Sequence, residues 1–280
     1  MFNHSLFTRM NYLKLFLLSL IFMSFVCKKN KSTNSIENST NYNLDSSYKT
    51  IHILVALCDN QYQGIVPVPA KIGNGQDPKN NLYWGCGYGI KTYFKKSKEW
   101  TLVKTYKKDS IIIERALFKH KTKKYILIAD AYDGKFIKNT TIDFIKSCSG
   151  QKKDSFQYNN KIYGCNGNSE FISYIGHNGL MDFTVDDSIK NTDGNTRTCS
   201  ILACISRDYF TNFIKMAKAK PVLWTTQLMC PEAYTIHDAL SSWINNESDL
   251  KVQESAAKAY SKYHPSCSVN CAKRLLVTGF

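Results

Sequence analysis

The sequence lacks the short motifs that mark metal and nucleotide sites. It has no CxxC pair and no HExxH motif, and Cys267 and Cys271 have no second cysteine pair at a suitable distance, so we expect no metal ion. It also lacks the spacings GxGxxG and GxxxxGKS/T, which cradle phosphates ahead of a helix. The glycines of the segment 85–89 are therefore expected to form a tight turn, and we expect no cofactor.

The apolar run near the N-terminus is too short to span a membrane. It covers the 12 residues Leu15–Val26, follows Arg9 and Lys14, and is followed directly by Cys27. A charged start and a short apolar core are typical of a signal peptide. Cys27 has the position of the lipidated cysteine of a bacterial lipoprotein, although Ser24-Phe25-Val26 matches the usual preceding residues poorly. We predict that residues 1–27 anchor an exported lipoprotein that faces the periplasm or the cell exterior, with plain secretion as the alternative.

Large apolar residues are almost absent from the next segment. Residues 28–47 read KKNKSTNSIENSTNYNLDSS, a composition that cannot build a core and is typical of a flexible tether. The remaining residues 48–280 show no internal repeat and are predicted to form one domain.

Acidic residues are scarce relative to basic ones. The chain has 22 Asp and Glu against 37 Lys and Arg, a formal charge of +15, which can indicate nucleic acid or another anionic partner. The lysines are dispersed and no nucleic-acid-binding motif accompanies them, so we expect no nucleic acid. Ten cysteines are present. Without Cys27 nine remain, so an oxidised protein keeps at least one free thiol, and the sequence leaves the pairing open.

Strand-like and helix-like segments alternate along the domain. The segment 51–58 (IHILVALC) is a continuous apolar run, typical of a strand buried on both faces. Further strands are expected at 101–106, 111–118, 125–131, 171–175, 200–203 and 222–225, and helices at 88–98, 141–148, from about 207, at 231–244 and at 252–263. This pattern predicts an α/β sandwich with a mainly parallel sheet flanked by helices, and an antiparallel hairpin region at 101–131.

Two residues with complementary chemistry follow successive strands. His177 follows the segment 171–175 within the sequence Gly176-His177-Asn178-Gly179, and Cys204 follows the segment 200–203. Active sites of open α/β sheets gather at the carboxyl ends of the strands, and a cysteine that faces a histidine forms a nucleophile with its base. The helix expected from about Ser206–Asp208 could direct free N–H groups toward the thiolate or an oxyanion. The alternative is a buried cysteine beside an unrelated loop histidine.

The segments 171–179 and 199–206, an apolar block ending in His-Asn-Gly and another ending in Ala-Cys, resemble the caspase-like cysteine peptidases. This family includes caspases, legumains, gingipains and clostripain. The resemblance implies that His177 is the catalytic histidine and Cys204 the nucleophile of a peptidase that cleaves after one preferred residue of a peptide or protein substrate. It also implies an oxyanion-binding N–H near Asn178 and Gly179, although the family usually has glycine where this chain has Asn178. A caspase-like domain without catalysis, acting as an exported binding or scaffold module, is the alternative.

Weaker candidates lie at other strand ends. Asp59, and Asp130 with Asp133, could offer carboxylates to a basic substrate side chain, but Asp59 could also cap a turn and Asp133 could belong to one. The resemblance places Trp224 and Thr225 in the wall of a substrate-binding pocket, with a core position for Trp224 as the alternative. His237 is expected to be structural.

Overall fold

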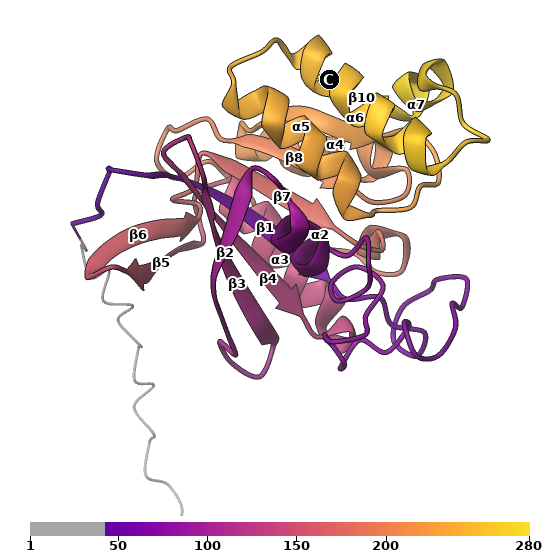
Figure 1. Cartoon of the computed structure of the whole chain (residues 1–280), viewed down its shortest axis with the longest axis horizontal. Helices are drawn as coiled ribbons and strands as arrows, with labels where there is room; N and C mark the ends of the chain where they lie inside the picture. The colour runs from indigo at the N-terminus through magenta and orange to yellow at the C-terminus, as the bar shows by residue number, and fades with distance from the viewer. Residues whose placement is uncertain (1–42) are drawn as a thin grey trace, which may run out of the picture. The chain divides into compact units, whose positions relative to one another are not determined.

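A central eight-stranded sheet organises the chain from residue 43 to residue 280, the part that the computed structural model describes (Figure 1). The strand order is β10-β9-β8-β7-β1-β4-β3-β2. The strands are β1 (Lys49–Ala56), β2 (Trp100–Tyr106), β3 (Ile112–His120), β4 (Tyr125–Tyr132), β7 (Phe171–Ile175), β8 (Thr198–Leu202), β9 (Lys220–Thr225) and β10 (Leu276–Val277). The five central strands from β9 to β4 are parallel, whereas β10 at one edge and β3 and β2 at the other pair antiparallel. The predicted α/β fold with a mainly parallel sheet is therefore confirmed.

Helices cover both faces of this sheet. On one face, a core cluster joins alternate β1 residues, including Ile51 and Ile53, to α2 (Ile90–Lys96), α5 (Ala233–Ile244), α6 (Asp249–Tyr263) and α7 (Val269–Leu275). On the other, Leu54 and Ala56 pack with α3 (Ile137–Cys148) and α4 (Ser206–Ala217). Because each face buries alternate residues of β1, the strand needs a nearly continuous apolar run, and its one buried ionisable residue, His52, is bonded to Asp130.

A second, two-stranded sheet was not anticipated. The strands β5 (Lys153–Tyr158) and β6 (Lys161–Asn166) form a hairpin between α3 and β7, where no strand is expected from the sequence, and Figure 1 shows it beside the main sheet. Its turn residues Asn159 and Asn160 have φ values of 48° and 59°, the left-handed conformation that two-residue hairpin turns require and that Asn tolerates.

The predicted anchor, including Cys27, and the tether up to residue 42 lie outside the described residues. The last tether residues lie against the β5–β6 hairpin: the Asp45 N–H donates to the Ile162 carbonyl at 2.7 Å, and the Asp45 carboxylate pairs with Lys161 at 2.8 Å. Within residues 43–280, no helix combines the length and the apolar character that crossing a membrane requires.

Candidate active site

The register of β7 and β8 sets the positions of the candidate pair. These strands are parallel neighbours, with Ile175 opposite Leu202. His177 and Cys204 each follow this matched pair by two residues, so both lie at the carboxyl edge of the sheet. The intervening Gly176 has a φ of 142° and lies against the Ala56 carbonyl of β1. A side chain would be strained and obstructed there, which explains the glycine before His177.

Asn178 joins the two loops directly. Its side chain is fully buried, and its amide donates to the Cys204 carbonyl at 2.7 Å while its oxygen accepts the Leu180 N–H at 3.1 Å. The Tyr174 hydroxyl fixes the same loop by donating to the His177 carbonyl at 2.7 Å. Asn178 has a φ of −77°, so its backbone conformation does not require the glycine that the caspase-like resemblance suggests at this position.

The imidazole of His177 is oriented by a carboxylate. Its Nε2 lies 2.8 Å from Asp182 Oδ2, and the ring is almost completely buried. The Gly64 N–H donates to the same carboxylate oxygen at 3.0 Å, and any side chain at position 64 would collide with Asp182. When Nε2–H donates to the carboxylate, Nδ1 keeps the basic lone pair.

Sequence reasoning missed Asp182, although it lies only five residues after His177. The signal that could have found it is a carboxylate within the same short loop as a candidate base, because catalytic imidazoles commonly depend on such an orienting group.

Cys204 is a free, half-buried thiol at a tight strand-to-helix turn. Its Sγ lies 3.4 Å from the Met229 N–H nitrogen and 3.6 Å from the Met229 carbonyl oxygen. The next residue, Ile205, has a φ of 49° and a ψ of 34°, a strained conformation for a β-branched residue. The hydrogen bonds of the thiol thus go to Met229 and those of the His177 ring to Asp182, and in the described part of the chain none joins the two side chains.

The expected oxyanion donors at the start of α4 are already occupied. The Ile205 N–H donates to the Gln227 carbonyl at 3.0 Å, and the Ser206 N–H donates to Thr225 Oγ1 at 3.0 Å. Among residues 43–280, no protein acceptor bonds the backbone N–H groups of Asn178 and Cys204. Because Asn178 has no exposed surface, the N–H of the half-buried Cys204, rather than the first N–H groups of the helix, is the candidate oxyanion donor.

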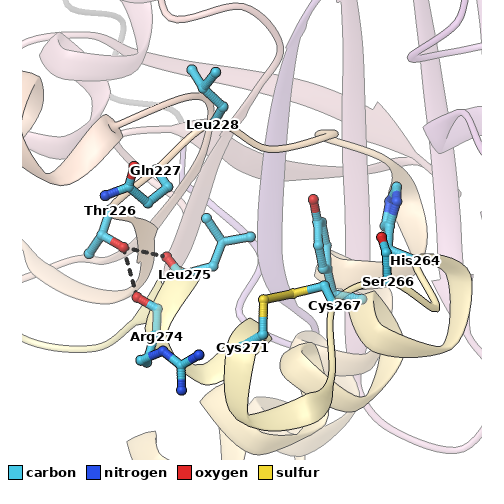
Figure 2. A pocket seen from close by; sticks show the side chains of 10 residues that line it. Thr226, Gln227, Leu228, His264, Ser266, Cys267, Cys271, Arg274 and Leu275 are labelled. Atoms are coloured by element: carbon cyan, nitrogen blue, oxygen red, sulfur yellow. Dashed lines mark hydrogen bonds between the residues drawn. A yellow bond between two sulfur atoms is a disulfide. The ribbon is translucent and has the colours of Figure 1, made fainter.

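A pocket of about 500 Å³ opens beside the segment 226–228 (Figure 2). One wall is the segment 226–228, whose Gln227 carbonyl accepts the Ile205 N–H, and the opposite wall comes from the ends of α6 and α7 with the Cys267–Cys271 disulfide. Figure 2 shows the Thr226 hydroxyl bonded to the carbonyls of Arg274 and Leu275, at 2.7 and 3.4 Å, which holds the walls together.

The weaker substrate-binding candidates do not line this pocket. Asp59 is buried and accepts N–H groups from Gln61 and Tyr62 at 2.8 and 3.1 Å, so it caps a turn. Trp224 is fully buried in the core on the α3–α4 side of the sheet. Thr225 is also buried, where its hydroxyl accepts the Ser206 N–H. Trp224 and Thr225 belong to the buried end of β9, and the pocket begins only after the strand ends, at Thr226.

The remaining candidates have structural roles. Asp130 forms a buried ion pair with Arg115. Asp133 caps a short 3₁₀ helix by accepting the Lys135 N–H at 2.9 Å. His237 bonds Ser97 Oγ at 2.7 Å and Asp238 Oδ1 at 2.8 Å, and neither partner belongs to the candidate pair.

Comparison with known proteins returned no match: no family model, no curated protein and no solved structure matches this chain.

Proposed function

We propose that this protein is a cysteine-dependent peptidase that uses Cys204 as nucleophile and His177 as acid and base. The observation that carries the proposal is the matched register of β7 and β8, which brings a free thiol and an imidazole to adjacent loops at the carboxyl edge of the sheet. The Asp182 carboxylate on the imidazole and the Asn178 bridge to the Cys204 carbonyl support it, because both restrain the loops that must act together.

The chemistry assigns a role to each group. His177 Nδ1 takes the thiol proton, and the Cys204 sulfur forms a bond to the carbonyl carbon of the substrate. The backbone N–H group of Cys204 stabilises the resulting oxyanion. The imidazolium then gives its proton to the leaving amine as the C–N bond breaks, and water hydrolyses the thioester with His177 again as base. Asp182 holds the ring in the required tautomer and stabilises its charged form.

The pocket beside the segment 226–228 suits the side chain of the preferred substrate residue. Its wall shares the Ile205–Gln227 hydrogen bond with the nucleophile loop, so a peptide placed across Cys204 can direct one side chain between Leu228 and the Cys267–Cys271 disulfide. A volume of about 500 Å³ is within the range of specific small-ligand pockets.

One observation favours the alternative function, a peptide-binding module without catalysis. The Cys204 sulfur contacts the Met229 backbone, whereas the His177 ring bonds Asp182. Catalysis requires a rotation of the thiol or a small loop movement when substrate binds, as is common for enzymes without ligand. A binding module needs no such movement.

Alkylation with iodoacetamide distinguishes these two functions. Burial raises the pKa of Cys58 to about 11 and that of Cys165 to about 12, and it also raises the pKa of Cys86 and of Cys230. These thiols remain protonated near neutral pH and should react slowly. We expect Cys204 to be alkylated at pH 6.5 at least about tenfold faster than the more exposed Cys230, because a thiolate beside an imidazole reacts faster. Mass mapping of tryptic peptides measures both rates. Labelling of Cys204 no faster than in the urea-unfolded chain would contradict the peptidase and leave the binding module.

The substitution Asp182→Asn tests the orienting carboxylate. We expect kcat to fall by roughly 10²-fold or more, with little change in KM, because the amide no longer fixes the imidazole tautomer. Asp182→Glu should recover part of the loss and of the pH profile. Asp186→Asn, which changes an exposed carboxylate in the same loop, is the matched control and should leave kcat unchanged. Equal activity of Asp182→Asn and Asp186→Asn would show that Asp182 only shapes the loop.

A further inference from the structure

Six exposed lysines gather at the end of the sheet opposite the candidate active site. Lys95 and Lys96 belong to the last turn of α2, and Lys98 follows it. The other three lie in the turn between β3 and β4. We call this set the lysine end: Lys95, Lys96, Lys98, Lys121, Lys123 and Lys124.

Hydrogen bonds hold the two segments of the lysine end together. The Lys121 N–H donates to the Glu99 carbonyl at 2.8 Å, and the Lys121 ammonium group donates to the Ser97 carbonyl at 3.4 Å. The set is therefore one surface of the folded domain, although its two segments are more than twenty residues apart in the sequence.

The charge of the lysine end is not neutralised locally. Within residues 43–280, none of the six ammonium groups forms an ion pair, whereas many other lysines of the domain do. The nearby carboxylates are already engaged: Glu99 accepts the Ser241 hydroxyl at 2.6 Å, and Glu170 pairs with Lys49 at 3.1 Å. Lys95 and Lys96 also suit a helix C-terminus, but this preference does not account for the three lysines of the β3–β4 turn.

The lysine end is also where the chain enters the sheet. The Lys49 N–H at the start of β1 donates to the Lys124 carbonyl at 3.0 Å. The sequence places the apolar run 15–26 and Cys27 upstream of this point. His177 and Cys204 follow strands parallel to β1 at the other end of the sheet. The eight residues of β1 separate the two ends by roughly 25 Å, at about 3.3 Å per residue.

We propose that the lysine end binds the anionic headgroups of membrane phospholipids. Charge complementarity favours this partner, and the entry of the chain at the same end fits the predicted anchor, because stable attachment commonly combines an acyl chain with a basic surface. Bound in this way, the domain directs its candidate active site away from the membrane. This inference does not depend on peptidase activity.

Vesicle binding by the full-length chain tests the proposal. The probes are vesicles of phosphatidylcholine alone and of phosphatidylcholine with 30% phosphatidylglycerol, and the difference between them removes the contribution of the apolar run. Each lysine near an anionic surface strengthens binding by about fivefold. We therefore expect the triple variant Lys121→Glu, Lys123→Glu, Lys124→Glu to lose at least about tenfold in its preference for the anionic vesicles, and 0.5 M salt to abolish the preference of the wild type.

A charge-matched variant is the control. Lys71→Glu, Lys79→Glu, Lys190→Glu changes three exposed loop lysines outside the lysine end and should keep the preference, and thermal melting confirms that both variants fold. Equal losses in the two variants would show an effect of net charge only and overturn the proposal. The proposal would also be overturned if the wild type showed no preference for the anionic vesicles. It would be overturned in favour of nucleic acid if the triple variant lost affinity for a 30-nucleotide oligonucleotide but not for the vesicles.

Discussion

The substitution Cys204→Ala is expected to abolish peptide cleavage, lowering catalytic efficiency by roughly 10³-fold or more. Without the sulfur no thioester forms. The backbone N–H of residue 204 and the His177 imidazole can then only assist direct attack of water on the peptide carbonyl. Cleavage of a mixed peptide library, followed by mass spectrometry, measures this loss and also identifies the residue before the cleaved bond.

Cys86→Ser is the matched control for this substitution. Cys86 is also a free, half-buried cysteine, and its thiol donates to the Asn80 carbonyl at 3.0 Å. Its replacement should leave cleavage unchanged. If the wild type cleaves the library and Cys204→Ala cleaves it equally well, Cys204 is not the nucleophile. If the wild type cleaves nothing but binds peptides, the binding module is the correct function.

The substitution Asp130→Asn is expected to lower the free energy of unfolding by about 3–5 kcal/mol. The Asp130 carboxylate is fully buried and accepts Arg115 Nε–H and Nη2–H, each at 2.6 Å, and it lies 3.0 Å from His52 Nε2. The Asn166 N–H donates to His52 Nδ1 at 2.9 Å, so the neutral ring donates through Nε2. Removing the carboxylate charge leaves the Arg115 guanidinium buried without a counter-charge.

Urea unfolding measures this change. Asp249→Asn is the control, because Asp249 pairs with Lys220 at 2.8 Å on the surface, where an ion pair contributes about 1 kcal/mol or less. The double variant Arg115→Met, Asp130→Leu removes both buried charges and should recover much of the lost stability. A loss for Asp130→Asn no larger than for Asp249→Asn would contradict the buried network.

The same network makes the fold sensitive to acid. Burial lowers the pKa of His52 below its usual 6.5 despite the neighbouring Asp130. As the pH falls, the unfolded chain therefore protonates His52 before the folded chain does. His52 contributes its full stability above about pH 6.5, and this contribution is lost at lower pH, by at most about 1.4 kcal/mol per pH unit. Burial alone would raise the pKa of Asp130, but Arg115 and His52 hold it well below its usual value, and its contribution is lost only below about pH 4. His52→Gln should flatten the loss between pH 6.5 and 5 without removing it, because burial also lowers the pKa of His120.

The sequence by itself determined which segments form strands and helices, and which strand ends carry the candidate catalytic residues. A strand buried on both faces is apolar at most positions, so β1 is visible as an apolar run that His52 alone interrupts between residues 51 and 58. The short polar links between β2, β3 and β4 predict their hairpins. His177 and Cys204 are identified as strand-exit residues because each follows an apolar block of strand length. These features depend on neighbouring residues and on burial, which a single sequence records.

Only the tertiary structure decided which groups meet. The polar hairpin of β5 and β6 is stabilised by packing against residues distant in the sequence, and its composition alone does not distinguish it from a loop. The Asp182 carboxylate that contacts His177 also accepts the Gly64 N–H from another loop, and the contact of Cys204 with Met229 follows from the pairing of β8 with β9. Trp224 packs into the core beside α3 and α4, whereas Thr226 lies beyond the end of β9 and lines the pocket, and the place where β9 ends depends on its pairing with β8 and β10. Residue types and spacing therefore locate the candidate pair, whereas partners and orientation follow from long-range packing that no local pattern encodes.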